Sequence, residues 1–341
     1  MPLEIALPCL RPLLSRSVCS VNTHVTGYTF ALPATNDTCS SVFHPSCVSG
    51  GSMADRLSTK IVIPHPTAPI SGITGILEQL DPQTSTHGRK ITLILHGTMG
   101  HKDYLFQRRL AQRLPQDSFR FDFRGNHETP GTFNQGGFAD DIEDLSAVAQ
   151  HLQNVYGYVI SAVVGHSRGS LVGMRWVSTS EDARNVTACI NVSGRYRMAK
   201  ILEGPAAKVR QDAFDTQGFY DWTTTVARKS VTVRMYPAGQ DLFINWDTSF
   251  VWDKFPAHIH VLTLHGLSDQ TVPPYDAHIY ARALGARSPG THTLHMVEDA
   301  DHNFTGRQDQ VVDYMLEWWD LHERGELKTS GLWMTGVRGK L

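Results

Sequence analysis

The chain has 341 residues, of which 41% are hydrophobic, and this allows one large core with room for an insertion. Its 31 basic and 33 acidic residues leave a formal net charge of -2, which gives no electrostatic reason to expect nucleic acid or an anionic membrane as a partner. No apolar run reaches the ~18 residues that span a bilayer. These features predict a soluble globular protein without a transmembrane segment, and they leave its oligomeric state open.

The N-terminal segment, residues 1–58, lacks a sustained hydrophobic period, and we expect it to be a flexible extension. It carries four of the five cysteines, at spacings that match no zinc pattern. Prolines interrupt its first apolar run and the basic residues follow that run, which is untypical of a secretory signal. We expect a cytoplasmic location, with a mitochondrial transit peptide containing Arg11 and Arg16 as the alternative.

From residue 60 onward, short apolar runs alternate with segments that carry apolar residues at helical spacing. The alternation favours an α/β class with a mostly parallel, doubly wound sheet and helices on both faces. Strands are predicted at residues 60–65, 70–80, 90–95, 119–123, 159–164, 187–192, 259–264 and 291–297, and helices at residues 104–114, 138–155 and 311–321.

A glycine-containing turn follows the strand predicted at residues 159–164. Residues 165–169 read Gly-His-Ser-Arg-Gly, and a helical pattern begins directly after them. The glycines two positions on either side of Ser167 leave room for a strained turn that lifts the serine hydroxyl clear of the sheet. The arrangement is typical of a nucleophile elbow, although so short a pattern also occurs by chance.

A serine nucleophile needs a general base within hydrogen-bond distance, and that base needs a carboxylate to orient it. In a doubly wound sheet both come from loops at the carboxyl ends of later strands. Asp269 follows the strand at residues 259–264 and is the candidate acid, although a turn or helix-capping role stays open for it. His302 follows the last strand and is the candidate base. The order of serine, acid and histidine agrees with a triad built on such a turn.

Two backbone N–H groups are needed to stabilise the oxyanion that forms as serine attacks a carbonyl group. Arg168 supplies one, because it follows the nucleophile at the start of a helix. The other is expected in the His-Gly-Thr-Met-Gly run at residues 96–100, from Thr98 or, as second choice, from Met99. Met99 is also a candidate for contact with substrate, and the run could alternatively be only a glycine turn.

Residues 194–256 are too many for a single crossover and are rich in aromatic side chains. We expect an inserted cap between the sixth and seventh strands, with Trp222 and Trp246 as candidates for the few rings that contact substrate. The alternative is a small satellite core. The predicted α/β core then comprises residues 59–193 and 257–323, and residues 324–341 form a tail with no assigned structure.

Patterns for metals and cofactors are missing from the sequence. There is no His-Glu-x-x-His, and His258 and His260 share a strand face without a third ligand at a recognisable spacing. The dinucleotide-binding motif Gly-x-Gly-x-x-Gly does not follow the first strand, and the Walker lysine motif of nucleotide-binding proteins is not present. We therefore expect neither a metal nor a cofactor.

Five motifs resemble those of the α/β-hydrolase superfamily over residues 60–323: LILHGTMGHKDY, FDFRGNHETPG, VVGHSRGS, LHGLSDQTVP and DADHNF. Within the superfamily the chain is similar to single-domain serine esterases related to cinnamoyl and feruloyl ester hydrolases and to monoacylglycerol-lipase-like enzymes. The resemblance implies hydrolysis of a small-molecule carboxylic ester through an acyl-enzyme on Ser167. It also implies a structural role for the turn that contains Asp122, His127 and Glu128.

One residue departs from the pattern of these esterases, which more often carry an uncharged residue after the nucleophile. We expect the Arg168 side chain to point outward and not to meet an anionic substrate. The same triad would also serve a thioesterase, an acyltransferase or a peptidase. A further alternative of another class is a member that binds a ligand or partner without catalysis.

Overall fold

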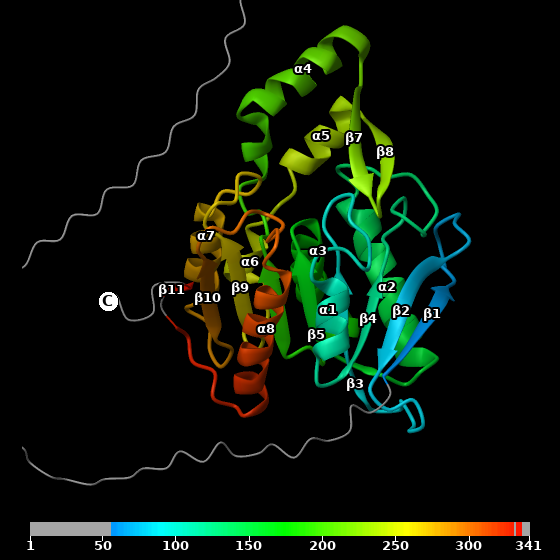
Figure 1. Ribbon diagram of the computed structural model, residues 1–341, viewed down its shortest axis with the longest axis vertical. Helices are drawn as coiled ribbons and strands as arrows, with labels where there is room; N and C mark the ends of the chain where they lie inside the picture. The colour runs from blue at the N-terminus through cyan, green and yellow to red at the C-terminus, as the bar shows by residue number, and fades with distance from the viewer. Residues whose placement is uncertain (1–55, 331, 336–341) are drawn as a thin grey trace, which may run out of the picture. The chain divides into compact units, whose positions relative to one another are not determined.

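The computed structural model describes residues 56–330 and the backbone of residues 332–335 (Figure 1). The extension predicted for residues 1–58 therefore lies outside the described residues, apart from its last three positions. Leu57 and Ser58 are already part of the first strand. Among residues 56–330 and 332–335, no helix is long and apolar enough to cross a membrane.

A nine-stranded sheet lies at the centre of the described residues, in the order β1-β2-β4-β3-β5-β6-β9-β10-β11. Strand β2 is antiparallel to both of its neighbours, and every other pair is parallel. The predicted α/β class and mostly parallel sheet are thus confirmed. The strands are β1 (Leu57–Ile63), β2 (Ile73–Gln79), β3 (Lys90–Leu95), β4 (Asp117–Phe121), β5 (Val159–His166), β6 (Ala188–Val192), β9 (His260–Gly266), β10 (His292–Val297) and β11 (Leu332–Thr335).

Helices cover both faces of the sheet because successive strand side chains point to opposite sides. In β5, Val163 joins one buried cluster, while Ala162 and Val164 on either side of it join another. Each fully buried aliphatic side chain stabilises the fold by roughly 1.5–3 kcal/mol. The first cluster includes residues of α2 (Phe138–Asn154), α3 (Arg168–Thr179), α6 (Phe250–Asp253) and α7 (Tyr275–Leu284); the second includes residues of α1 (Gln107–Arg113) and α8 (Gln308–Glu323).

Three elements differ from the sequence-based expectation. Helix α1 begins at Gln107 and not at residue 104, because Leu105 has a φ of 50° and interrupts the helical backbone. Helix α7 follows two prolines that suggest a turn, yet proline is also favoured where a helix begins. Strand β11 lies in the unassigned tail, where its four residues pair with β10. So short a strand depends on its partner more than on its own pattern.

An insertion occupies the chain between β6 and β9. Its C-terminal part belongs to the main core, since Phe250 and Val251 of α6 are buried there. Figure 1 shows the rest of the insertion beyond one end of the strands of the large sheet. This rest comprises α4 (Pro205–Gln217), β7 (Tyr220–Val226), β8 (Lys229–Met235) and α5 (Pro237–Ile244).

Strands β7 and β8 form a separate antiparallel hairpin. Along β7, half-buried side chains such as Trp222 alternate with exposed ones such as Thr223, so the hairpin has one face toward the protein and one toward solvent. Ala227 and Arg228 at its turn both have positive φ, the conformation that matches the twist of a two-residue hairpin. The alternation can be seen in the sequence, but no hairpin was predicted here.

Candidate active site

Ser167 lies in the turn between β5 and α3 with a φ of 52°. Two glycines make the turn sterically feasible. A Cβ on Gly165 would lie 2.4 Å from the Ser170 amide nitrogen, and one on Gly169 would lie 2.6 Å from the His96 carbonyl oxygen. A non-glycine residue at such a φ stores about 1–3 kcal/mol of strain, which the surrounding packing must offset. The local backbone therefore has the form expected of a nucleophile elbow.

Three residues from separate loops are connected by hydrogen bonds at the carboxyl ends of the strands. His302, after β10, places Nε2 3.0 Å from Ser167 Oγ. Its other ring nitrogen, Nδ1, lies 2.7 Å from Oδ2 of Asp269, after β9. With Nδ1–H donating to the carboxylate, Nε2 is left to accept the hydroxyl proton of the serine. The structure thus brings together the three residues proposed from the sequence.

The Asp269 carboxylate is held by the backbone as well as by side chains. Its Oδ1 accepts hydrogen bonds from the amides of Thr271 and Val272, both at 2.8 Å. Burial raises the pKa of Asp269, but hydrogen bonds from His265 and His302, together with the charges of these two side chains, lower it by more, so the pKa lies below its usual range. The carboxylate consequently stays ionised at neutral pH.

His265 is a site residue that the sequence analysis did not assign. Its Nε2 lies 3.2 Å from Asp269 Oδ2 and 2.9 Å from the Val272 carbonyl oxygen. The available signal was its position at the end of a buried strand, four residues before the candidate acid. It supports the acid loop by contacting both this carboxylate oxygen and the Val272 carbonyl oxygen.

The loop that carries His302 is fixed by two polar groups. His166, beside the nucleophile, directs Nε2 to the His302 carbonyl oxygen at 3.0 Å. Burial, together with the charge of His302, lowers the pKa of His166 to about 3, so this imidazole is neutral and donates a hydrogen bond without adding charge. Asp301 Oδ1 accepts the amides of Asn303 and Thr305 at 3.1 and 2.9 Å.

The loop after β3 lies against the elbow. A Cβ on Gly97 would come within 2.8 Å of His166 Nδ1 and 3.3 Å of the His166 carbonyl oxygen, so a larger residue has little room here. Thr98 and Met99 line the same cavity as Ser167. Arg168 is the first residue of α3, where a backbone N–H has no acceptor within the helix. Both backbone donors proposed from the sequence are therefore near the serine.

A cavity of about 420 Å³ adjoins the serine and the histidine. From the insertion, Tyr220, Trp222 and Phe243 contribute its aromatic lining. Met99 also packs in a cluster with Trp222. Trp246 does not line this cavity; its ring stacks on Phe138, which does, with 4.7 Å between centroids.

A model of the alpha/beta hydrolase family matches residues 92–314. The chain belongs to this family. An uncharacterised protein of Saccharomyces cerevisiae is 28% identical over 234 residues, which cover 64% of this chain and 69% of the relative.

Solved structures show the same fold. Est1E from Butyrivibrio proteoclasticus is 16% identical with a TM-score of 0.53, and the match covers 76% of this chain and 97% of Est1E. The esterase Pf2001 of Pyrococcus furiosus is 16% identical with a TM-score of 0.54, covering 79% of this chain and 90% of the esterase. Family and fold together support hydrolase activity.

The Arg168 side chain of this α/β hydrolase does not point outward, so that expectation was wrong. The residue is only 5% exposed, and Nε lies 2.6 Å from Asp141 Oδ2 of α2. Its guanidinium also donates to the Gln135 carbonyl oxygen and lies 4.2 Å from the centre of the Phe138 ring. Tertiary contacts with α2 and the loop before it hold the side chain inside.

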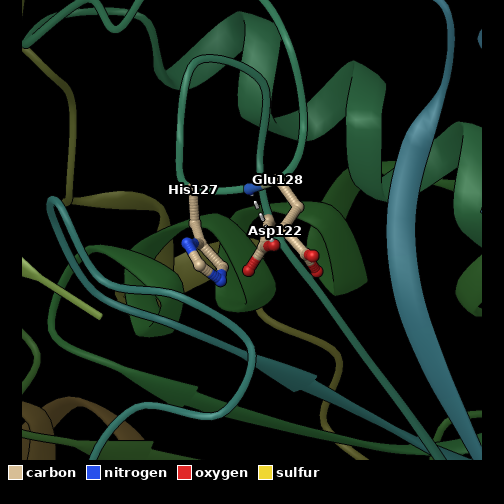
Figure 2. Close-up of side chains that lie close together, drawn as sticks. All are labelled: Asp122, His127 and Glu128. Atoms are coloured by element: carbon tan, nitrogen blue, oxygen red, sulfur yellow. Dashed lines mark hydrogen bonds between the residues drawn. The ribbon is translucent and has the colours of Figure 1, made fainter. Parts of the chain in front are cut away.

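One group of side chains in the hydrolase has the spacing of a metal site. Asp122, His127 and Glu128 place one ligand atom each within 4.8 Å of one another, and Figure 2 shows them converging from one turn. However, the Lys102 ammonium lies 2.7 Å from Asp122 Oδ2 and also bonds Glu128. Hydrogen bonds from Lys102 and Lys60 lower the pKa of Glu128 to about 2. Two lysines thus already bond these carboxylates, and Lys60 of β1 joins the turn to the sheet.

Proposed function

We propose that this α/β hydrolase is a serine hydrolase that cleaves a carboxylic ester through an acyl-enzyme on Ser167. The observation that carries the proposal is the continuous hydrogen-bond chain from Ser167 through His302 to Asp269, at the wall of a cavity. A serine hydroxyl is a weak nucleophile at neutral pH, and this chain is the arrangement that activates it.

In the proposed first step, His302 Nε2 takes the hydroxyl proton as Ser167 Oγ attacks the carbonyl carbon. Asp269 stabilises the imidazolium that results, and it keeps Nδ1 as the donor. The amides of Arg168 and Thr98, or Met99 in place of Thr98, stabilise the negative charge that develops on the carbonyl oxygen. His302 then gives its proton to the leaving alcohol.

In the second step, water attacks the acyl-enzyme with His302 again as the base, and Ser167 is released with the carboxylic acid. Residues 194–256 act as a cap in this proposal, with Met99 and Trp222 in contact with substrate. The names of similar proteins favour an ester: Pf2001 is an esterase, and Est1E has a structure with ferulic acid bound.

The serine is tested by Ser167→Ala with p-nitrophenyl acetate and butyrate. We expect kcat to fall by about 10⁴-fold or more, because removing a triad nucleophile leaves only the contributions of binding and the oxyanion donors. Ser178→Ala is the matched control. Ser178 lies on α3 and donates to the Met174 carbonyl oxygen at 2.8 Å, and this variant should keep kcat within about twofold. Undiminished turnover by Ser167→Ala would rule out the proposal.

The ester preference is tested with an ester, a thioester and an amide that share one acyl group. The proposal predicts the highest kcat/KM for the ester. A higher value for the thioester or amide, abolished in Ser167→Ala, would keep the serine mechanism and replace the substrate class.

A further inference from the structure

The cavity beside Ser167 is lined by basic side chains without acidic ones. Within residues 56–330, its lining includes Arg168, Arg195 and Arg210, and neither aspartate nor glutamate. The charge of Arg168 is balanced by Asp141 at 2.6 Å. The other two arginines have different surroundings.

Arg195 lies just after β6 and is only 8% exposed. Its Nη2 donates to the Thr271 carbonyl oxygen at 2.5 Å, and within residues 56–330 no carboxylate lies within ion-pair distance of it. The nearest acids are engaged elsewhere: Asp276 bonds Arg197 at 2.6 Å, and Asp269 bonds His302. Burial lowers the pKa of Arg195, and these two acids only partly oppose that effect. A guanidinium nonetheless stays charged at neutral pH.

Arg210 lies on α4, in the insertion, and is half-buried. Its guanidinium donates to two neutral groups, the Gln240 side-chain oxygen and the Ile201 carbonyl oxygen, the latter at 2.7 Å. Burial lowers the pKa of this side chain too, and no carboxylate raises it. The core and the insertion therefore each bring one guanidinium without a bonded carboxylate to the same cavity.

A shielded cation without a bonded carboxylate costs free energy, part of which an incoming anion would recover. Guanidinium groups also match the planar oxygens of carboxylates and phosphates better than any other side chain does. We propose that the cavity takes an ester that carries a carboxylate or phosphate group, bound by Arg195 and Arg210 away from the scissile carbonyl. This inference rests on the proposed serine hydrolase function, and it moves the anion-binding role from Arg168 to two arginines that the sequence analysis did not single out.

The test uses two matched pairs of esters. Monoethyl adipate is compared with the isosteric carboxamide, ethyl adipamate, and 2-phosphoethyl butyrate with 2-hydroxyethyl butyrate. The wild-type protein should favour at least one anionic member by about 10- to 100-fold in kcat/KM, as expected for charged hydrogen bonds. The pair that shows the preference identifies the anion as carboxylate or phosphate. Equal rates within both pairs would overturn the inference.

Arg210→Gln and Arg195→Gln should remove most of the anion preference, measured as the ratio of kcat/KM within each pair of esters. Lys208→Gln is the control, because it removes one charge from the exposed side of the same helix and should keep the preference. If Arg195→Gln does not fold, Arg210→Gln alone tests the anion preference, since the Arg210 side chain is only half-buried and its replacement should be tolerated. A preference that survives in Arg210→Gln as strongly as in Lys208→Gln contradicts the inference.

The failure of this inference can be told apart from the failure of the proposed function. Hydrolysis of the neutral esters that depends on Ser167, without an anion preference, removes the inference and leaves the serine esterase. If no ester is turned over, calorimetric titration with adipate and 2-phosphoethanol decides. Binding that weakens about tenfold in Arg210→Gln supports the anion site, and absence of binding refutes it.

Discussion

The two sides of the cavity are built by different means. On the core side, backbone contacts hold the reactive groups: glycines allow the turn at Ser167, amides hold Asp269, and a carbonyl contact positions the loop of His302. On the insertion side, half-buried side chains such as Trp222 and Arg210 line the cavity from elements with few residues in the main core. We infer that the core side determines the chemistry and the insertion determines which substrate reaches it.

The largest expected effect is on the core side. Asp269→Asn should lower kcat by about 10⁴-fold with the fold intact, because asparagine no longer stabilises the imidazolium or selects its tautomer. Steady-state kinetics with p-nitrophenyl butyrate and a thermal unfolding curve measure the two properties. Asp301→Asn is the control, since an amide oxygen can replace Oδ1 as acceptor of the loop amides. A loss below about tenfold in Asp269→Asn would remove that residue from the mechanism.

The buried pair behind the elbow should give the next largest effect, on stability. Arg168→Met leaves the Asp141 carboxyl buried without its partner, and we expect the free energy of unfolding to fall by about 3–5 kcal/mol. Urea unfolding measures it. The double variant Arg168→Met with Asp141→Leu should recover much of the loss, because it removes the orphaned carboxyl. A single variant within about 1 kcal/mol of wild type would contradict the structural role of this pair.

A smaller effect concerns pH. The pKa of Asp269 is lowered in the folded protein, so the ionised carboxylate contributes stability above its unfolded pKa of about 4, and this contribution is lost as pH falls through the folded value. We expect the free energy of unfolding of the wild type to exceed that of Asp269→Asn by about 1–3 kcal/mol at pH 7, and this difference to shrink as the pH falls below 4. Unfolding free energies measured between pH 3 and pH 8 test this. If the difference in unfolding free energy does not depend on pH, it comes from the packing of the side chain and not from the charge of the Asp269 carboxylate.

The smallest effect separates two tryptophans of the insertion. Trp222→Ala should raise KM for an aromatic acyl ester by about tenfold and leave kcat for p-nitrophenyl acetate within about threefold, because the ring lines the cavity and does not touch the triad. Trp246→Ala should instead lower stability without a change in KM, since that ring packs on Phe138. Equal effects on KM in both variants would remove the distinction.

The sequence was most informative where local geometry is demanding. The close approach at Gly165 and Gly169 permits only glycine, so the pattern around Ser167 is visible in a few neighbouring residues. The loops after β9 and β10 follow clear apolar runs, which is why Asp269 and His302 could be proposed, and the structure places them beside Ser167.

Contacts between residues that are far apart in the chain could not be predicted from the sequence. The Arg168 side chain turns inward because of Asp141, which lies 27 residues earlier in the chain and meets it only in the folded structure. Trp246 was selected as an aromatic residue of the insertion, but its ring stacks on Phe138 and does not line the cavity. Half-buried and exposed side chains alternate along β7, so the hairpin of β7 and β8 could have been predicted. Strand β11, in contrast, forms through pairing with β10.

The most direct test of the central claim is the mass-spectrometric site of modification after the folded protein reacts with a fluorophosphonate. We expect one adduct, on Ser167, that is lost in Ser167→Ala and in protein unfolded before the reaction. An unmodified Ser167 in the folded protein, or an adduct carried by another residue in its place, would contradict it.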